Sequence, residues 1–263
     1  MNTSEENVLL SIDERGVATV TLNRPETHNA FNQDVIKALT EAFNQVHQND
    51  SVKAMVLASN GKSFSAGADL NWMKAMASYS LEENETDAGK LAEMFRVLYF
   101  LNKPTIARVQ GAAFGGAIGL ISCCDIAIGS RLSKFCLSEV KLGLIPATIS
   151  PYVVKAIGAR LAKRYFMTAE VFSSRRARRI GLLSETVSET ELDSTIEDLL
   201  ASLLKNGPEA VSKAKALVDF VDGKTIDSEL IQATSSKIAQ TRVSEEGQEG
   251  LSAFLEKRKP NFN

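Results

Sequence analysis

Two glycine-rich stretches decide the fold: Ser63-Phe64-Ser65-Ala66-Gly67-Ala68-Asp69-Leu70 and Gly111-Ala112-Ala113-Phe114-Gly115-Gly116-Ala117. Each follows a predicted strand and leads into a helix or coil, and the small residues let the backbone approach a ligand closely. Two such loops could present two backbone N–H groups to one developing oxyanion. The second N–H would lie at a helix N-terminus, where the dipole favours negative charge. Taken singly, each loop is more often only a site of tight turns and close packing.

Short strand and helix patterns alternate around these loops. The periodicity predicts an amphipathic helix over 32–48 and a second helix over 91–101. It predicts strands over 8–13, 17–23, 54–58, 105–109, 126–128 and 135–137, the first two joined by a hairpin at Arg15-Gly16. A strand-strand-helix rhythm of roughly 45 to 50 residues indicates a right-handed spiral of similar layers.

The pattern changes near residue 190. From there on, helices are predicted over 192–204, 209–221, 226–241 and 244–257, separated by turn signals such as Asn206-Gly207-Pro208. We therefore expect an α/β core over residues 1–190 and a helical C-terminal region over residues 191–263. Such an extension often packs on a neighbouring subunit.

Composition restricts the function classes. The 263 residues are 44% hydrophobic and 24% charged, which is enough apolar material for a sizeable core. With 32 acids and 30 bases the net charge is −2, which argues against a protein built around nucleic acid or an acidic membrane. The uncharged segment 109–124 has 16 residues, fewer than the roughly 20 that a membrane helix needs. We expect no membrane span, and the polar N-terminus shows no signal peptide.

Cysteine and histidine usage narrows the chemistry. The three cysteines, two of them adjacent, do not suit a disulfide scaffold, so we expect a reducing cytoplasm. No metal site is expected, because no set of Cys and His residues has ligand spacing. With only His28 and His47 present, proton transfers in an enzyme would fall to carboxylates.

Glu139 is the candidate acid. It stands among Leu137, Val140, Leu142, Leu144 and Ile145, and apolar surroundings favour the neutral carboxyl, which raises the pKa towards a value useful for proton transfer. A helix cap or a salt-bridged glutamate is the alternative.

A basic run, Arg175-Arg176-Ala177-Arg178-Arg179, follows Arg160, Lys163 and Arg164. It could bind phosphates, although such runs are more often a solvated helix face.

Taken in order along the chain, these motifs resemble the crotonase, or enoyl-CoA hydratase/isomerase, superfamily. The matching segments are Leu22-Asn23-Arg24-Pro25 with Asn29-Ala30, Phe64 to Leu70, Gly111 to Gly116, Cys124-Asp125-Ile126, Ser138-Glu139 through Pro146, and Ala253 to Pro260 with Phe262. The resemblance implies a spiral of repeated ββα turns with a helical C-terminal trimerisation region, assembled as a trimer or a dimer of trimers. It also implies an acyl-CoA thioester substrate and no metal or redox cofactor.

The resemblance also assigns roles to residues. The thioester oxygen would accept hydrogen bonds from the N–H groups of Ala68 and Gly116. The CoA channel would be lined by Arg24, Ala30, Ser65, Ala66, Gly67, Asp69 and Leu70. Lys257 would reach the CoA of an adjacent subunit.

One departure bears on the reaction. Hydratases of the family carry two catalytic glutamates; one corresponds to Glu139, and the position of the other is Gly119 here. A single acid is what the double-bond isomerases of the family use, whereas a hydratase can work with one acid if the substrate or ordered water supplies the rest.

The sequence around these motifs is similar to that of the bacterial methylglutaconyl-CoA hydratases, a branch of the family that acts in leucine and acyclic-terpenoid breakdown. The similar segments are 69–73, 112–117, 123–125, 135–140 and 149–154. The leading hypothesis is therefore hydration of 3-methylglutaconyl-CoA to 3-hydroxy-3-methylglutaryl-CoA. The alternatives are an enoyl-CoA Δ3-Δ2 isomerase and a non-catalytic acyl-CoA or RNA-binding protein.

Overall fold

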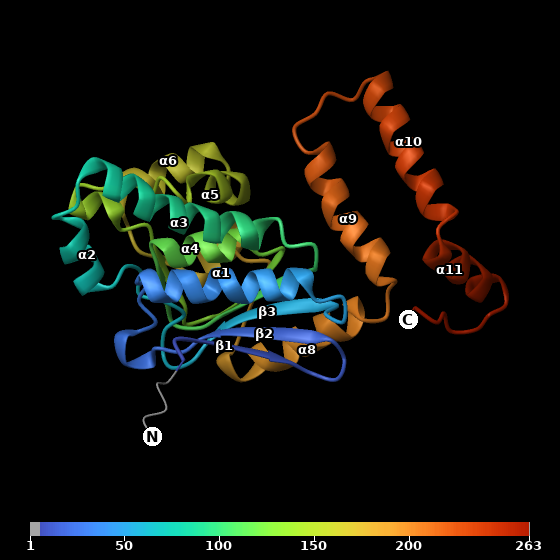
Figure 1. The fold of residues 1–263 in the computed structure, drawn as a ribbon, viewed down its shortest axis with the longest axis horizontal. Coiled ribbons are helices and arrows are strands. Elements are labelled where there is room, and N and C mark those ends of the chain that lie inside the picture. The colour runs from blue at the N-terminus through green and yellow to red at the C-terminus, as the bar shows by residue number, and fades with distance from the viewer. Residues whose placement is uncertain (1–5, 263) are drawn as a thin grey trace.

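The computed structural model describes residues 6–262, and a six-stranded sheet forms its centre (Figure 1). The strands lie in the order β1 (Val8–Ile12), β2 (Val17–Leu22), β3 (Ala54–Ser59), β4 (Thr105–Val109), β6 (Ile126–Ser130) and β9 (Glu185–Val187). β1 and β2 pair antiparallel across the predicted hairpin, whose Gly16 N–H donates to the Asp13 carbonyl. All other neighbours pair parallel, which requires a crossover connection between them.

Helix α1 (Gln33–Gln48) covers one face of this sheet (Figure 1). It begins where predicted, because the Asn32 side chain accepts the Val35 N–H as an N-cap. Its apolar stripe is buried in the main core, while its other face stays polar.

Helix α3 (Leu81–Tyr99) packs beside α1 and begins earlier than the helix predicted over 91–101. Its first turns are polar and carry no apolar stripe, so periodicity missed them. A capping box starts the helix instead: the Ser80 side chain accepts the Glu83 N–H, and the Glu83 carboxylate accepts the Ser80 N–H.

A second, three-stranded sheet holds the second glycine stretch. Its order is β5 (Ala112–Phe114), β7 (Lys134–Cys136) and β8 (Phe172–Ser173). The uncharged segment 109–124 thus resolves into the end of β4, β5 and the short buried helix α4 (Gly116–Cys123). Among residues 6–262, no helix is long and apolar enough to cross a bilayer.

The remaining helices surround this framework. They are α2 (Leu70–Met76), α5 (Ser150–Ile157), α6 (Ala159–Thr168), α7 (Ser174–Arg179), α8 (Leu192–Leu203), α9 (Pro208–Val221), α10 (Ser228–Arg242) and α11 (Glu245–Leu255), with the 3-10 turns η1 (Pro25–Thr27), η2 (Glu139–Leu142) and η3 (Glu189–Glu191). The four helices predicted after residue 190 are α8 to α11, so this part of the prediction is confirmed.

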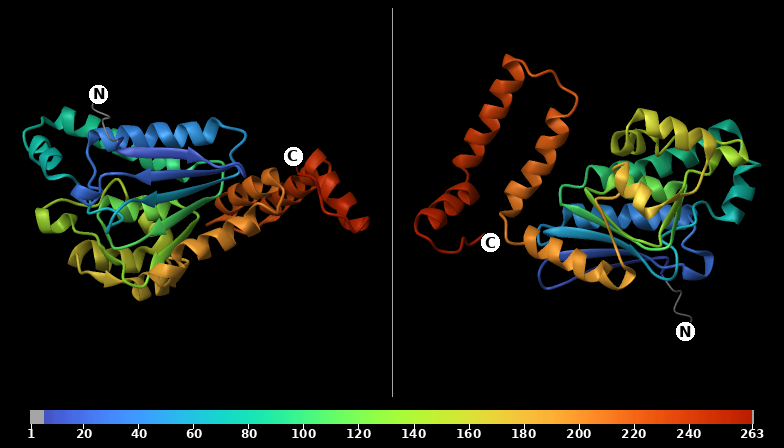
Figure 2. Two further views of the ribbon diagram at one scale, coloured as in Figure 1. Left: turned by 90° about the horizontal axis from the view of Figure 1, so that it is seen from below. Right: turned by 180° about the vertical axis from the view of Figure 1, so that it is seen from behind.

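The C-terminal helices behave in two ways. α8 covers the sheet, with Leu192, Ile196 and Leu200 buried in a second apolar cluster. Helices α9 to α11 project from the body as an arm (Figure 2). α9 and α10 bury no residue, and the arm exposes large apolar side chains such as Ile226 and Phe254. The division of the chain between residues 190 and 191 stays a prediction. The expectation that the N-terminus carries no signal peptide concerns in part residues 1–5, which lie outside the described residues.

Cys123, Cys124 and Cys136 are free thiols, as the cysteine count predicts. Within the described residues, no cluster of His, Cys, Asp or Glu is arranged to hold a metal ion.

The close packing at Gly111 predicts that a larger residue there destabilises the protein. Gly111 has a φ of +60°, and a Cβ there would lie 1.8 Å from the Lys62 carbonyl oxygen. Gly111→Ala should therefore lower the free energy of unfolding by about 3 kcal/mol, measured by urea denaturation.

Gly89→Ala is the matched control. Gly89 lies inside α3 with open space around it, so alanine there should raise stability by about 1 kcal/mol. Equal effects of the two substitutions would contradict this account of Gly111.

Candidate active site

The two glycine stretches lie side by side and are joined through their backbones. The Ser65 N–H donates to the Ala112 carbonyl at 3.1 Å, and the Phe114 N–H donates to the Ser65 carbonyl at 3.0 Å. Ser65 and Ala113 thereby form a parallel bridge between segments that are far apart in sequence. This bridge brings the two candidate oxyanion loops together.

Ala68 lies in a second bridge, opposite Phe31. The Phe31 N–H donates to the Gly67 carbonyl and the Asp69 N–H donates to the Phe31 carbonyl, both at 2.7 Å. In a parallel bridge the residue between these two groups directs its own N–H away from the partner. Among the described residues the Ala68 N–H donates to no acceptor, so it is available to a ligand.

Gly116 is the first residue of α4, directly after β5. The first N–H groups of a helix have no partner within it and carry the positive end of its dipole. The Gly116 N–H donates to no acceptor within residues 6–262. The structure thus leaves two N–H groups unpaired on neighbouring loops, as the predicted oxyanion hole needs.

Glu139 opens η2 and lies beside the second loop. A methyl group at Gly115 would lie 3.3 Å from its Oε1 atom, and the Gly115 N–H donates to Cys136 of the neighbouring strand β7. The Oε2 atom is buried and has no hydrogen-bond partner among the described residues.

Burial raises the pKa of Glu139, and a hydrogen bond from its own backbone N–H opposes this only in part. No charged neighbour contributes to this shift, and Ser138, not Glu139, is the N-cap of η2. The alternative of a capping or salt-bridged glutamate is therefore not what the structure contains.

Gly119 is packed too tightly to be replaced by an acid. A Cβ there would lie 2.3 Å from Ile149 Cγ2 and 2.9 Å from Phe95 Cε1, and both side chains are buried. The Phe95 ring also faces Gly116, one turn earlier on α4. An apolar wall of Ile149 and Phe95 therefore occupies the space of the second family acid.

Arg24 binds both the segment before α1 and the end of the first glycine loop. Its guanidinium donates to the Ala30 carbonyl at 2.9 Å and pairs with the Asp69 carboxylate at 3.3 Å. Asp69 also caps α2 by accepting the N–H groups of Asn71 and Trp72. Burial opposes ionisation of Asp69, but these donors and Arg24 together hold its pKa below the ordinary value. The pair fixes α2 next to Ala68.

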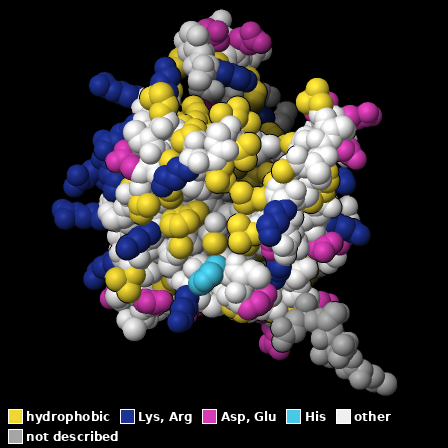
Figure 3. All heavy atoms as spheres, turned by 90° about the vertical axis from the view of Figure 1, so that its left-hand side faces the viewer, with side chains coloured by type: hydrophobic (Ala, Val, Ile, Leu, Met, Phe, Trp, Pro, Cys, Tyr) yellow, Lys and Arg dark blue, Asp and Glu magenta, His cyan; other side chains and the backbone are white. Residues whose placement is uncertain are grey.

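The other predicted binding residues differ in how far they are exposed to solvent. Ser65 and Gly67 are buried, with the Gly67 N–H donating to the Ser65 hydroxyl, whereas Ala66 and Leu70 are exposed. Leu70, Leu142, Leu144 and Ile145 expose more than half of their surface. Figure 3 shows hydrophobic side chains gathered around a hollow on the face that carries α2.

Lys257 does not join the other predicted residues. It follows α11, at the opposite end of the molecule from α2 (Figure 1). Within one chain it lies far from both glycine loops.

Three supporting residues, Asn29, Gln110 and Ile149, received no role from the sequence. Asn29, at φ +55°, donates to the carbonyls of Asn60 and Ser63 and accepts the Arg24 N–H. Gln110 donates to Ser59 and Gly61, which ties the turn before the first loop to β4. Asn is one of the few residue types that adopt positive φ readily, which is a signal available in Asn29. Nothing local marked Gln110 or Ile149.

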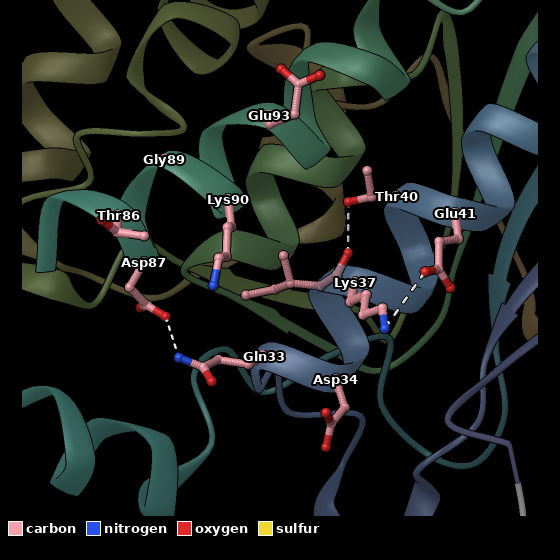
Figure 4. A pocket seen from close by; sticks show the side chains of 11 residues that line it. Gln33, Asp34, Lys37, Thr40, Glu41, Thr86, Asp87, Gly89, Lys90 and Glu93 are labelled. Atoms are coloured by element: carbon pink, nitrogen blue, oxygen red, sulfur yellow. Dashed lines mark hydrogen bonds and ion pairs between the residues drawn. The ribbon is translucent and has the colours of Figure 1, made fainter. Parts of the chain in front are cut away.

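A cavity of about 640 Å³ lies elsewhere, between α1 and α3 (Figure 4). Charged and polar side chains line it, including Lys37, Lys90 and Asp87, whose carboxylate accepts from Gln33 at 2.6 Å. None of the predicted site residues lines this cavity.

Comparisons with known proteins identify the family. The family model for enoyl-CoA hydratase/isomerase matches residues 13–263. A crotonyl-CoA hydratase from Syntrophomonas wolfei is 33% identical, covering 98% of each chain, and a short-chain enoyl-CoA hydratase from Clostridium acetobutylicum is 33% identical over 96% of each.

Solved structures show the same fold. An enoyl-CoA hydratase from Shewanella pealeana superposes with a TM-score of 0.94 at 44% identity, covering 98% of this chain and 96% of that one. The range matched by the family model, residues 13–263, contains both glycine loops and Glu139. This chain therefore belongs to the enoyl-CoA hydratase/isomerase, or crotonase, family of enzymes.

Proposed function

We propose that this enzyme reversibly adds water to an α,β-unsaturated acyl-CoA. The observation that carries the proposal is the Glu139 carboxyl group, which lies beside the second glycine loop and whose Oε2 atom is buried with no hydrogen-bond partner among the described residues. The Ala68 and Gly116 N–H groups on the two glycine loops are also unpaired within residues 6–262. This arrangement combines one acid or base with donors for a developing oxyanion.

The proposed reaction begins with ionised Glu139. The carboxylate takes a proton from water as the water oxygen bonds to the β-carbon, and the π electrons of the double bond move onto the thioester. The resulting enolate oxygen accepts hydrogen bonds from Ala68 and Gly116, each contributing about 3 to 4 kcal/mol of transition-state stabilisation. Glu139 then gives its proton to the α-carbon; dehydration is the reverse, and no metal or redox cofactor is required.

For the acyl group we propose 3-methylglutaconyl, hydrated to 3-hydroxy-3-methylglutaryl-CoA in leucine or terpenoid catabolism. The support is the resemblance to that branch together with the wall at Gly119. Since Ile149 and Phe95 leave no room for a second acid, a distal carboxylate on the substrate would help to position the water.

We further propose a cytoplasmic homotrimer or dimer of trimers. The support is the arm. No residue of α9 or α10 is buried within the described chain, and Phe254 and Leu255 are about four-fifths exposed. In such an assembly Lys257 would reach the CoA bound to an adjacent subunit. Arg24, Ala30 and residues 65–70 would line the CoA channel of the subunit to which they belong.

A second candidate is the Δ3-Δ2 isomerase, which the single acid and the closed wall at Gly119 favour. Glu139 would then move one proton between the α- and γ-carbons while the same N–H groups hold the enolate. The non-catalytic acyl-CoA or RNA-binding alternative is not favoured, because the relatives are named as hydratases.

A panel of acyl-CoA esters, with and without a distal carboxylate, tests the proposal. We expect a product heavier by the mass of water and the highest kcat/KM for the ester with the distal carboxylate. Glu139→Gln should lower kcat by about 100-fold or more, and exposed Glu14→Gln is the matched control. Isomerisation without a mass change on a 3-enoyl-CoA, or full activity of the Gln variant, would overturn the hydratase proposal.

The pH profile is a second prediction. Because burial raises the pKa of Glu139 and the free enzyme must start with this group ionised, kcat/KM should rise with pH. The midpoint should lie above the ordinary glutamate value of about 4.3, with a plateau at higher pH. A midpoint at or below that value, measured in steady-state assays, would contradict the role of Glu139.

The wall at Gly119 predicts coupling between two positions. Gly119→Ala should destabilise the protein by about 1 to 3 kcal/mol through overlap with Ile149. Ile149→Gly removes the closest overlap of the added methyl group and leaves only the contact with Phe95, so a double-mutant cycle in urea should give a coupling energy of about 1 kcal/mol or more. Additive effects would show that Ile149 does not fill this space.

A further inference from the structure

Helices α6 and α7 carry the same arrangement of positive charge. Arg160, Lys163 and Arg164 occupy i, i+3 and i+4 on α6, and Arg175, Arg178 and Arg179 repeat this spacing on α7. Residues at these spacings share one helix face. All six are exposed, and we call them the cationic face.

The cationic face is largely unneutralised. Residues 158–184 contain seven bases and one acid, a net charge of +6, although the whole chain carries −2. Glu170 pairs with Arg164; within residues 6–262 the other five members of the face form no ion pair. Like charges at i, i+4 destabilise a helix by roughly 0.2 to 0.5 kcal/mol per pair, so this arrangement works against folding.

The cationic face lies close to the candidate site. β8 leads directly into α7 and is separated from β5 by one strand, β7. Two strand spacings of about 4.8 Å place β8 roughly 10 Å from the strand that precedes Gly116. α6 packs against η2, which carries Glu139. This strand separation is comparable to one Debye length at 0.1 M salt, so charges on the helix that follows β8 are not fully screened from the neighbourhood of the site.

We infer that the cationic face steers the phosphate-bearing CoA part of the substrate towards the site, an inference that rests on the proposed function. The diphosphate and 3′-phosphate of CoA are anionic, and a chain with net negative charge would otherwise slow their approach. Figure 3 shows Lys and Arg side chains along one edge of the face that carries the apolar hollow.

The form of the face suits steering more than a fixed subsite. Its side chains are exposed, and apart from the Arg164–Glu170 pair none of them is held in one geometry by an ion pair among residues 6–262. Mobile exposed charges raise the rate of encounter without contributing to the bound geometry. The two helices are also short, at ten and six residues, which suits a small anion more than an extended polymer.

The test compares two triple variants of the full chain. Arg175→Gln/Arg178→Gln/Arg179→Gln removes three charges from the face, and Lys37→Gln/Lys53→Gln/Lys205→Gln removes three exposed charges elsewhere. At low ionic strength the first should lower kcat/KM about tenfold with kcat unchanged, and the control should lower it far less. The difference should disappear near 1 M salt, where the Debye length is about 3 Å.

A second readout separates this inference from the proposed function. Trp72 is the single tryptophan and lies on α2, so stopped-flow fluorescence can follow association of butyryl-CoA, which has no double bond to hydrate. We expect the association rate constant to fall about tenfold in the Arg triple variant and in Arg160→Gln/Lys163→Gln, even if the wild type hydrates nothing.

The inference would be overturned by an unchanged association rate, by an equal loss in the control variant, or by a fall of kcat in step with kcat/KM. Salt-sensitive binding of an RNA oligomer with no effect on acyl-CoA association would also overturn it, and would assign the face to nucleic acid.

Discussion

The bridge between Ser65 and Ala113 is the interaction on which the rest of the site depends. It joins two loops that follow neighbouring parallel strands, and backbone hydrogen bonds leave little freedom in their relative position. Ala68 lies three residues beyond one end of the bridge and Gly116 three beyond the other. Because these donors are backbone groups, their placement depends on strand pairing and not on side-chain rotamers.

The same packing limits the chemistry available to the site. Phe95 faces both Gly116 and Gly119, and Ile149 closes the space behind them. These two side chains fill the space beside α4 where a second acid would stand, and Glu139 is the acid that lies beside the second glycine loop. Reaction type and apolar packing are therefore linked through one helix.

Much of this could be predicted from residues alone. The N-cap at Asn32, the alternating strands and the four C-terminal helices follow from local patterns, and both glycine loops and Glu139 stand out by their composition. The beginning of α3 could not be predicted from periodicity, since its first turns have no apolar stripe. The strands β5, β8 and β9 were also missed, because two or three residues carry no periodicity.

The sequence by itself determined which residues could do the chemistry: one acid in apolar surroundings, two loops small enough for a close backbone approach, and a glycine where a second acid is expected. Only the tertiary structure decided that these parts meet and that the Glu139 Oε2 atom is buried without a partner among the described residues. It also decided that Ile149 fills the space at Gly119 and that β8, which leads into the basic helix α7, belongs to the same sheet as β5. The physical reason is that local composition sets the properties of each segment, whereas burial and proximity arise from contacts between segments that are distant in the chain.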